Sequence, residues 1–301
     1  MRLKEIESYL QQVDFQKVRL SVGKLRISDR ELSNINAFKE FLNIIKKVDI
    51  YDDEINLLLE SDLYSTTKDN LFTEDSRALN IYNTAKYLVD STSSLNIVFK
   101  KLLPQSNEQS ISIKLPEPSD FEALNKTMVT VQKSISQIIS NDKIKGTTNI
   151  NHWEFGSFWI ELILGTEAAV ALIASSVWAA AVISKKFSEN KLFEQQARAM
   201  EIKNESLEDI LETQKELTNQ LLANEAQSVL DEHFDNNKDN EQLERLKLSI
   251  KTFATLIQNG AEIHPSIMAP EKVQNLFPNY KNIDMLTSRI KQIEDKHAES
   301  V

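Results

Sequence analysis

Glu161 is the residue of this chain best placed for acid–base chemistry, because it lies in the apolar run FWIELILG (158–165). Burial would raise the pKa of its carboxyl and suit it to act as an acid, a base or a pH switch. In a strand, however, Glu161 shares its face with Trp159, while Ile160 and Leu162 form the opposite face. We therefore favour a surface carboxylate on the wet face of an edge strand.

Other residue types that carry chemistry do not form a recognisable site. The chain has no Cys, which excludes disulfides, thiolate nucleophiles and Cys-ligated zinc or iron–sulfur clusters. The run DEHFD (231–235) could bind a divalent cation, but a solvated helix end explains it better, because hard cations need preorganised oxygen ligands. No HExxH pair is formed by the four histidines, which are His152, His233, His264 and His297.

Glycine-dependent sites are absent from the sequence as well. The five Gly never cluster, and SVGK (21–24) lacks the upstream Gly of a phosphate-binding loop. We therefore expect no catalytic residue, no cofactor and no metal, and a protein that is not an enzyme. The net charge of -10 argues against nucleic acid as a partner. The N-terminal MRLKEIESYLQQ has no apolar signal region, so a cytoplasmic protein is the expectation.

The most apolar stretch of the chain runs from Phe158 to Lys186 and is the feature on which function should depend. Its uninterrupted part, Ala168–Ser184, is at the short end of the roughly 20 residues that span a bilayer. Three environments remain open: the core of the monomer, an interface between subunits, or lipid. The residues expected to contact a subunit or lipid are Trp159, Glu161, Glu167, Ala168, Ala171, Ser175, Trp178, Ala179 and Val182.

Few Gly and Pro and long periodic stretches predict a mainly α protein: a helical bundle with a small strand–helix–strand element and one very long helix. We expect four segments, which are an N-terminal helical bundle (1–104), the strand–helix–strand element (105–165), the long helix with an apolar N-terminal half (166–234) and C-terminal helices (235–301). A parallel pairing of the two strands is open to such an element.

Local signals place several helix ends. Capping-box spacing at Ser28/Glu31 and at Ser119/Glu122 predicts two helix starts. Asp239 should cap a helix that ends at Gly260. Within the long helix, a weak coiled-coil seam is predicted at residues spaced by seven or multiples of seven, which are Phe193, Met200, Leu207 and Leu221.

These observations favour a non-enzymatic helical protein that acts by self-association, as a homo-oligomer, and by protein–protein contact through the apolar Ala-rich helix. The alternative is a membrane-associated effector whose Thr166–Ser184 helix inserts conditionally or forms a pore. In general plan, long helices around one hidden apolar element, the chain resembles bacterial helical pore-forming toxins and membrane effectors of phage defence. The resemblance is architectural and implies no particular site residue.

Overall fold

The computed structural model describes residues 2–24, 29–154, 158–199, 205–234 and 239–290, with side chains left out for 197–199 and 205–208. The chain divides into two compact units, Met1–Gln105 and Ser106–Val301. The first predicted segment ends at residue 104, and the other three lie in the second unit. Each unit is described by itself.

The prediction of a mainly α bundle is wrong. The described residues are about 62% helix and 13% strand, and their seven strands form two antiparallel sheets, so the fold is mixed α and β. Strands such as SVGK, DRELS and EIHP are short and polar. They carry neither alternation nor β-branched enrichment, and cross-strand pairing rather than local pattern makes them strands.

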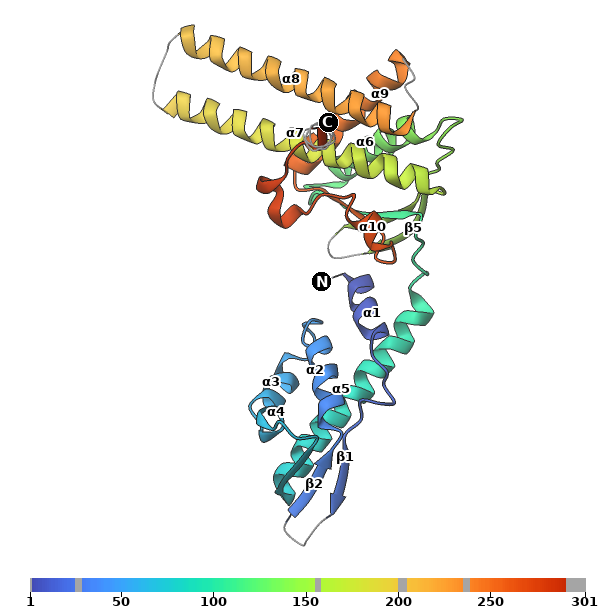
Figure 1. Cartoon of the computed structure of the whole chain (residues 1–301), viewed down its shortest axis with the longest axis vertical. Helices are drawn as coiled ribbons and strands as arrows, with labels where there is room; N and C mark the ends of the chain where they lie inside the picture. Colours follow the sequence, from blue (N-terminus) through green and yellow to red (C-terminus); the bar gives the residue numbers. More distant parts are fainter. Residues whose placement is uncertain (1, 25–28, 155–157, 200–204, 235–238, 291–301) are drawn as a thin grey trace, which may run out of the picture. The chain divides into compact units, whose positions relative to one another are not determined.

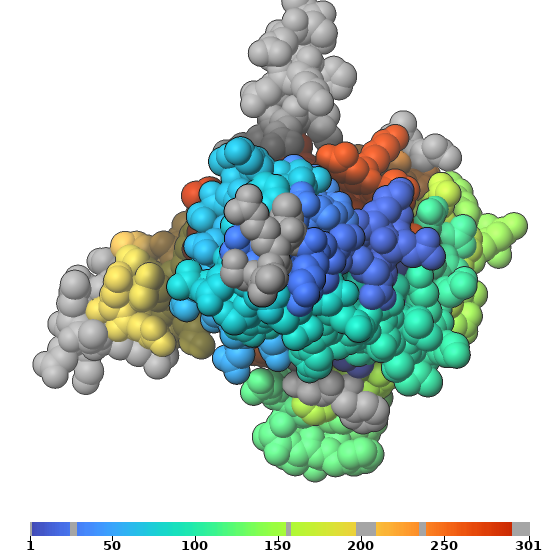
Figure 2. Space-filling view, turned by 90° about the horizontal axis from the view of Figure 1, so that it is seen from below, coloured from blue at the N-terminus to red at the C-terminus, as the bar shows by residue number. Residues whose placement is uncertain are grey.

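The N-terminal unit packs five helices and a three-stranded sheet, of order β1-β2-β3, around a mainly aliphatic core that includes the neighbouring rings of Phe38 and Phe41. Figure 2 looks onto this unit, whose blue to teal side chains form a closed surface on the face shown. Its elements are α1 (Leu3–Gln11), β1 (Ser21–Lys24), β2 (Asp29–Ser33), α2 (Ile35–Ile45), α3 (Asp52–Leu59), α4 (Asp62–Ser65), β3 (Asn70–Glu74) and α5 (Asp75–Leu102).

The helix expected from Ser28 begins later than predicted. Ser28 lies outside the described residues, and Glu31 lies in β2, paired in register with Phe72 of β3. Helix α2 starts after Asn34, whose φ of 70° is left-handed. Asn tolerates this conformation better than most residues, and here its amide is held by the Lys17 and Arg19 carbonyls, at 2.6 and 2.9 Å, in the chain before β1.

The second unit is built on a four-stranded antiparallel sheet of order β5-β6-β4-β7. The two strands of the predicted strand–helix–strand element are confirmed at Ser110–Lys114 and Trp159–Ile163. The parallel pairing that was open to them is not formed, since Ile113 pairs with Ile160 in an antiparallel register. An unpredicted strand, β5, precedes β6 and forms an antiparallel hairpin with it. The hairpin reverses the chain, so that β6 runs antiparallel to β4 beside it. The elements are β4 (Ser110–Lys114), α6 (Phe121–Ile139), β5 (Asn149–Glu154), β6 (Trp159–Ile163) and β7 (Glu262–Pro265).

The single very long helix is also wrong, because the chain reverses and forms two long helices that lie side by side (Figure 1). Residues 200–204 lie outside the described residues. A straight helix would leave Ala226, Val229 and Leu230 in water, whereas the hairpin buries all three. Burial of Val229 and of Leu230 contributes about 1.5–3 kcal/mol each at most. The remaining elements are α7 (Glu167–Ala199), α8 (Glu205–His233), α9 (Asn240–Gln258), α10 (Glu271–Gln274) and the 3₁₀ helix η1 (Tyr280–Met285).

Two of the predicted helix ends are confirmed in α9. The Asp239 carboxylate accepts the backbone N–H groups of Glu241 and Gln242, and Gly260 follows the helix with a φ of 92°. At α6 the cap is one residue later than predicted, since Asp120 rather than Ser119 accepts the Ala123 N–H, at 2.7 Å. Near the end of the predicted C-terminal helices (235–301), residues 280–285 form a 3₁₀ helix, and 291–301 lie outside the described residues.

Candidate functional site

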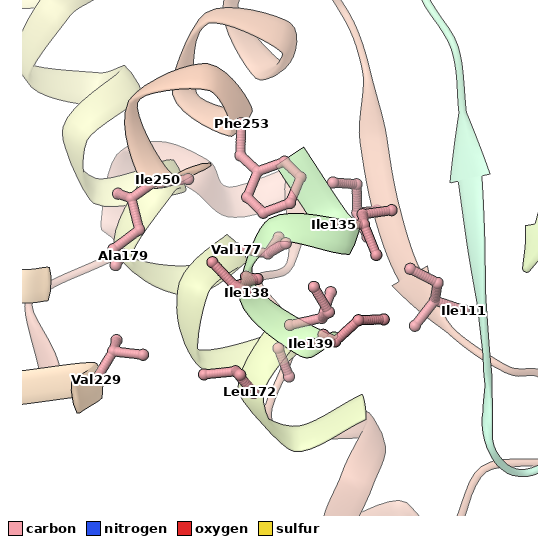
Figure 3. Close-up of a cluster of buried hydrophobic side chains, with 14 of the residues drawn as sticks. Ile111, Ile135, Ile138, Ile139, Leu172, Val177, Ala179, Val229, Ile250 and Phe253 are labelled. Atoms are coloured by element: carbon pink, nitrogen blue, oxygen red, sulfur yellow. The ribbon is translucent and has the colours of Figure 1, made fainter. Parts of the chain in front are cut away.

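The apolar half of α7 lies at the centre of the second unit. Figure 3 shows side chains from β4, α6, α8 and α9 gathered around it, among them Ile138, Val229 and Phe253. Leu172 and Val177 of α7 are fully buried. Within the described residues, one helix, Glu167–Gln196, is long and apolar enough to cross a membrane, and 78% of its most apolar 18-residue window is buried. In this structure the core covers most of the segment.

The predicted residues of this segment divide between surface and core. Glu167 and Ala168 are exposed in the first turn, where the carboxylate suits the positive end of the helix dipole. Ala171 and Trp178 are half-buried. Ser175, Ala179 and Val182 are buried, with small side chains that let α7 approach its neighbours closely.

Glu161 is not on a wet edge, and that favoured interpretation is wrong. Strand β6 is interior, between β5 and β4, and Glu161 is only 4% exposed. One carboxylate oxygen accepts the Ser110 hydroxyl at 2.7 Å, and within the described residues the other has no hydrogen-bond partner. In register, Glu161 lies between His152 and Ser112 on the sheet face that also carries Trp159.

A second polar cluster ties the edge strand β7 to the same sheet face. Glu262 accepts hydrogen bonds from Lys114 at 2.7 Å and from His264 at 2.9 Å. Burial raises the pKa of Glu262, but these two bonds outweigh it and hold the pKa below its usual value. The His264 ring packs between Trp159 and Tyr280. Among the described residues no group of three or more His, Asp or Glu could hold a metal ion.

Ser175, Glu232 and His233 form a polar link between α7 and α8. The Ser175 hydroxyl donates to Glu232 at 3.2 Å, and His233 Nε2 lies 3.0 Å from the Ser175 oxygen. Burial lowers the pKa of His233 against the opposing charge of Glu232. Glu232 approaches Nε2, the same nitrogen that faces Ser175, at 3.7 Å. In a catalytic triad the acid binds the other ring nitrogen, so this cluster lacks that geometry.

The C-terminal part of the chain returns across α7 and α8. The Arg289 guanidinium lies 3.9 Å from the centre of the Trp178 ring, and the Trp178 indole N–H donates to the Thr287 carbonyl at 3.1 Å. Burial raises the pKa of Glu225, while a hydrogen bond from Ser288 and the charge of Arg289 oppose the increase. Neither Glu225 nor Arg289 was predicted from the sequence. The pattern that could have identified Glu225 is an acidic residue between Leu222 and Ala226, inside the buried stripe of α8.

The outer parts of α7 and α8, residues 185–199 and 205–222, form a two-helix arm (Figure 1). The two helices are joined by a hydrogen bond from Asn190 to Thr218 at 3.0 Å, flanked by grooves of about 520 and 370 Å³. Phe193 and Leu221, predicted to share one seam, line the larger groove from opposite helices. Met200 and the side chain of Leu207, the other predicted seam positions, lie outside the described residues.

Comparison with known proteins gives a match that runs through both units. The chain is 27% identical over 294 residues to the uncharacterized protein YqaP of Bacillus subtilis (strain 168), covering 94% of each chain. No protein-family model matches the chain. No solved structure matches it either.

Proposed function

We propose that this protein is non-enzymatic and acts by self-association and protein–protein contact through the arm of α7 and α8. The observation that carries the proposal is exposed apolar surface beside an open groove: Leu192 is 56% exposed and Leu217 57% exposed, and both line the larger groove. The Ala-rich half of α7 is already covered within its own unit. The contact surface is therefore the outer part of the same helix, not its most apolar part.

A second copy of the arm is the partner that fits this surface. Two antiparallel helix pairs whose apolar seams are open on one side close into a four-helix bundle. The two charged residues that line the larger groove, Lys186 and Glu189, form an ion pair with each other at 2.6 Å, which lowers the repulsion between two copies at this point. The working protein is proposed to be a cytoplasmic homo-oligomer that does not bind nucleic acid, consistent with its net charge of -10.

Sedimentation equilibrium of the full chain tests this proposal. Wild type should associate at micromolar concentration, and Leu217→Glu should weaken association at least about tenfold, because an interface leucine contributes roughly 1.5–3 kcal/mol. The matched control is Leu248→Glu, since Leu248 of α9 is equally exposed at 57% and lies away from the groove. A monomeric wild type, or equal weakening by both variants, would contradict the proposal.

The membrane hypothesis keeps one specific support, which is that α7 has the length and mean hydropathy, 1.7, of a spanning helix. It requires the core to open, because that segment is mostly buried. Flotation with vesicles of phosphatidylcholine and phosphatidylglycerol, over a range of pH, separates the two hypotheses. Recovery of the full chain with the vesicles would favour insertion. Recovery in the lipid-free fraction at every pH would leave the arm as the site of action.

A further inference from the structure

We propose that residues 284–290, here named the latch, hold one face of α7 closed and that this segment can open while the rest of the unit stays folded. Trp178 and Lys185 contact this segment, and Val182 lies between them at helical spacing on the same face of α7. This inference concerns the inner half of α7 and does not depend on association through the arm.

The latch is attached to α7 by directed contacts at two levels of the helix. Near Ser184 the Lys185 ammonium donates to the Asp284 carbonyl. Two turns earlier, Trp178 donates its indole N–H to the Thr287 carbonyl, and Arg289 lies over its ring. A guanidinium over an indole is the strongest of the common cation–π pairs and holds the ring in one orientation.

Arg289 also links the latch to α8 and to the preceding loop. Its guanidinium donates to the Leu276 carbonyl at 3.0 Å, and its charge faces Glu225 and Glu232. Glu225 is only 3% exposed, and one of its carboxylate oxygens has no hydrogen-bond partner among the described residues. A buried carboxylate needs a counter-charge, and the contacts described for Glu225 are with the latch, at Ser288 and Arg289.

These anchors differ from those of the core. Thr287 and Asp284 are exposed, Met285 is 81% exposed, and Leu286 and Ile290 are only half-buried. A segment with few buried apolar contacts and exposed backbone opens at a lower free energy than the helices beneath it. Removing Arg289 should therefore uncover this face of α7 without unfolding α6 or α9.

Cysteine accessibility in the full chain tests the latch, because the protein has no Cys of its own. The probe is Val182→Cys, on the covered face at 6% exposure, and the reference probe is Ser134→Cys in α6 at 2% exposure. In the Arg289→Ala background, alkylation of the Val182 probe should accelerate by about tenfold or more, the factor expected for losing one charged contact. The Ser134 probe should change by less than about twofold.

Two further variants make the test decisive. Arg245→Ala removes a surface arginine whose partner is Glu241 and should leave both probes unchanged. Arg289→Lys keeps the charge but not the planar group over Trp178, and should give an intermediate rate even where Arg289→Ala folds poorly. An unchanged Val182 probe in both Arg289 variants would overturn the latch. A parallel increase at Ser134 would also overturn it, because it would signal global unfolding.

Discussion

Replacing Leu172 with Ala should destabilise the second unit far more than replacing Leu192 with Ala, although both residues lie in α7. Leu172 is fully buried and Leu192 is 56% exposed. Burial of a leucine contributes roughly 1.5–3 kcal/mol, and the cavity left by truncation adds to the loss, so we expect about 3 kcal/mol for Leu172→Ala. Leu192→Ala should cost less than about 0.5 kcal/mol when unfolding is measured below the micromolar range in which the arms are proposed to associate. Helix propensity changes equally in both variants and does not affect the difference.

Tryptophan fluorescence during urea unfolding is the assay, because all three tryptophans, Trp153, Trp159 and Trp178, belong to the second unit. The signal therefore reports that unit separately from Met1–Gln105. Both variants replace leucine with alanine in the same helix. A difference between their losses of unfolding free energy therefore reports how differently the two halves of α7 are buried. Equal costs, or a larger cost at Leu192, would refute the placement of the Ala-rich half in the core.

Three other changes have defined outcomes in the same assay or in thermal unfolding. Asp120→Ala should cost about 1 kcal/mol by removing the α6 cap, whereas Ser119→Ala should cost much less, contrary to the capping-box prediction. Gly165→Ala should destabilise by about 1–2 kcal/mol, because Gly165 has a φ of 82° and its missing Cβ would lie 3.0 Å from the Thr147 hydroxyl, whereas a Cβ at Gly23 would make only an ordinary contact, 4.0 Å from the Glu31 carbonyl. Burial lowers the pKa of His233, so below its ordinary value of 6.5 the unfolded chain takes up a proton before the folded unit does; stability should fall with decreasing pH, by at most about 1.4 kcal/mol per pH unit. His233→Gln should flatten that slope relative to wild type. The raised pKa of Glu225 gives a slope of opposite sign, but Glu225 is present in both proteins and does not affect the difference between them.

The sequence predicted those features that depend on neighbouring residues. Asp239 caps α9 and Gly260 ends it because side-chain oxygens and left-handed glycines act within one helical turn. The burial of the α7 segment also followed from composition, although three environments remained open. The reversal after Ala199 carries no Gly or Pro and depends on contacts between residues that are far apart in sequence. The polar segments likewise become strands because they pair with other strands, and a single sequence does not show that pairing.

The candidate site was harder to predict, because its geometry joins α7, α8 and the last described residues. Trp178 and Ser175 were singled out for their place in an apolar helix, but their partners, Thr287, Arg289 and Glu232, are more than 50 positions away. Glu161 was assigned to a wet surface because strand alternation reports which residues share a face, not what covers that face. The strand order that places Glu161 in the interior of the sheet arises only in the folded unit.

Helix α7 therefore lies in two environments, the core of the second unit in its apolar half and solvent in its outer part, and this explains why its composition changes at Lys185. The apolar half is held in place by aliphatic contacts from three helices and a sheet, which are not directional and tolerate small residues such as Ala179. The latch and the Ser175 link add directional polar contacts at the one face that those elements leave half covered. Beyond Phe187 the helix leaves the core, and within the described residues it packs against α8 in the arm, so it carries charged residues that remain in water yet retains Leu192 at the groove. Association at the arm and opening of the latch act on the same two helices, and any energetic coupling between them is necessarily reciprocal.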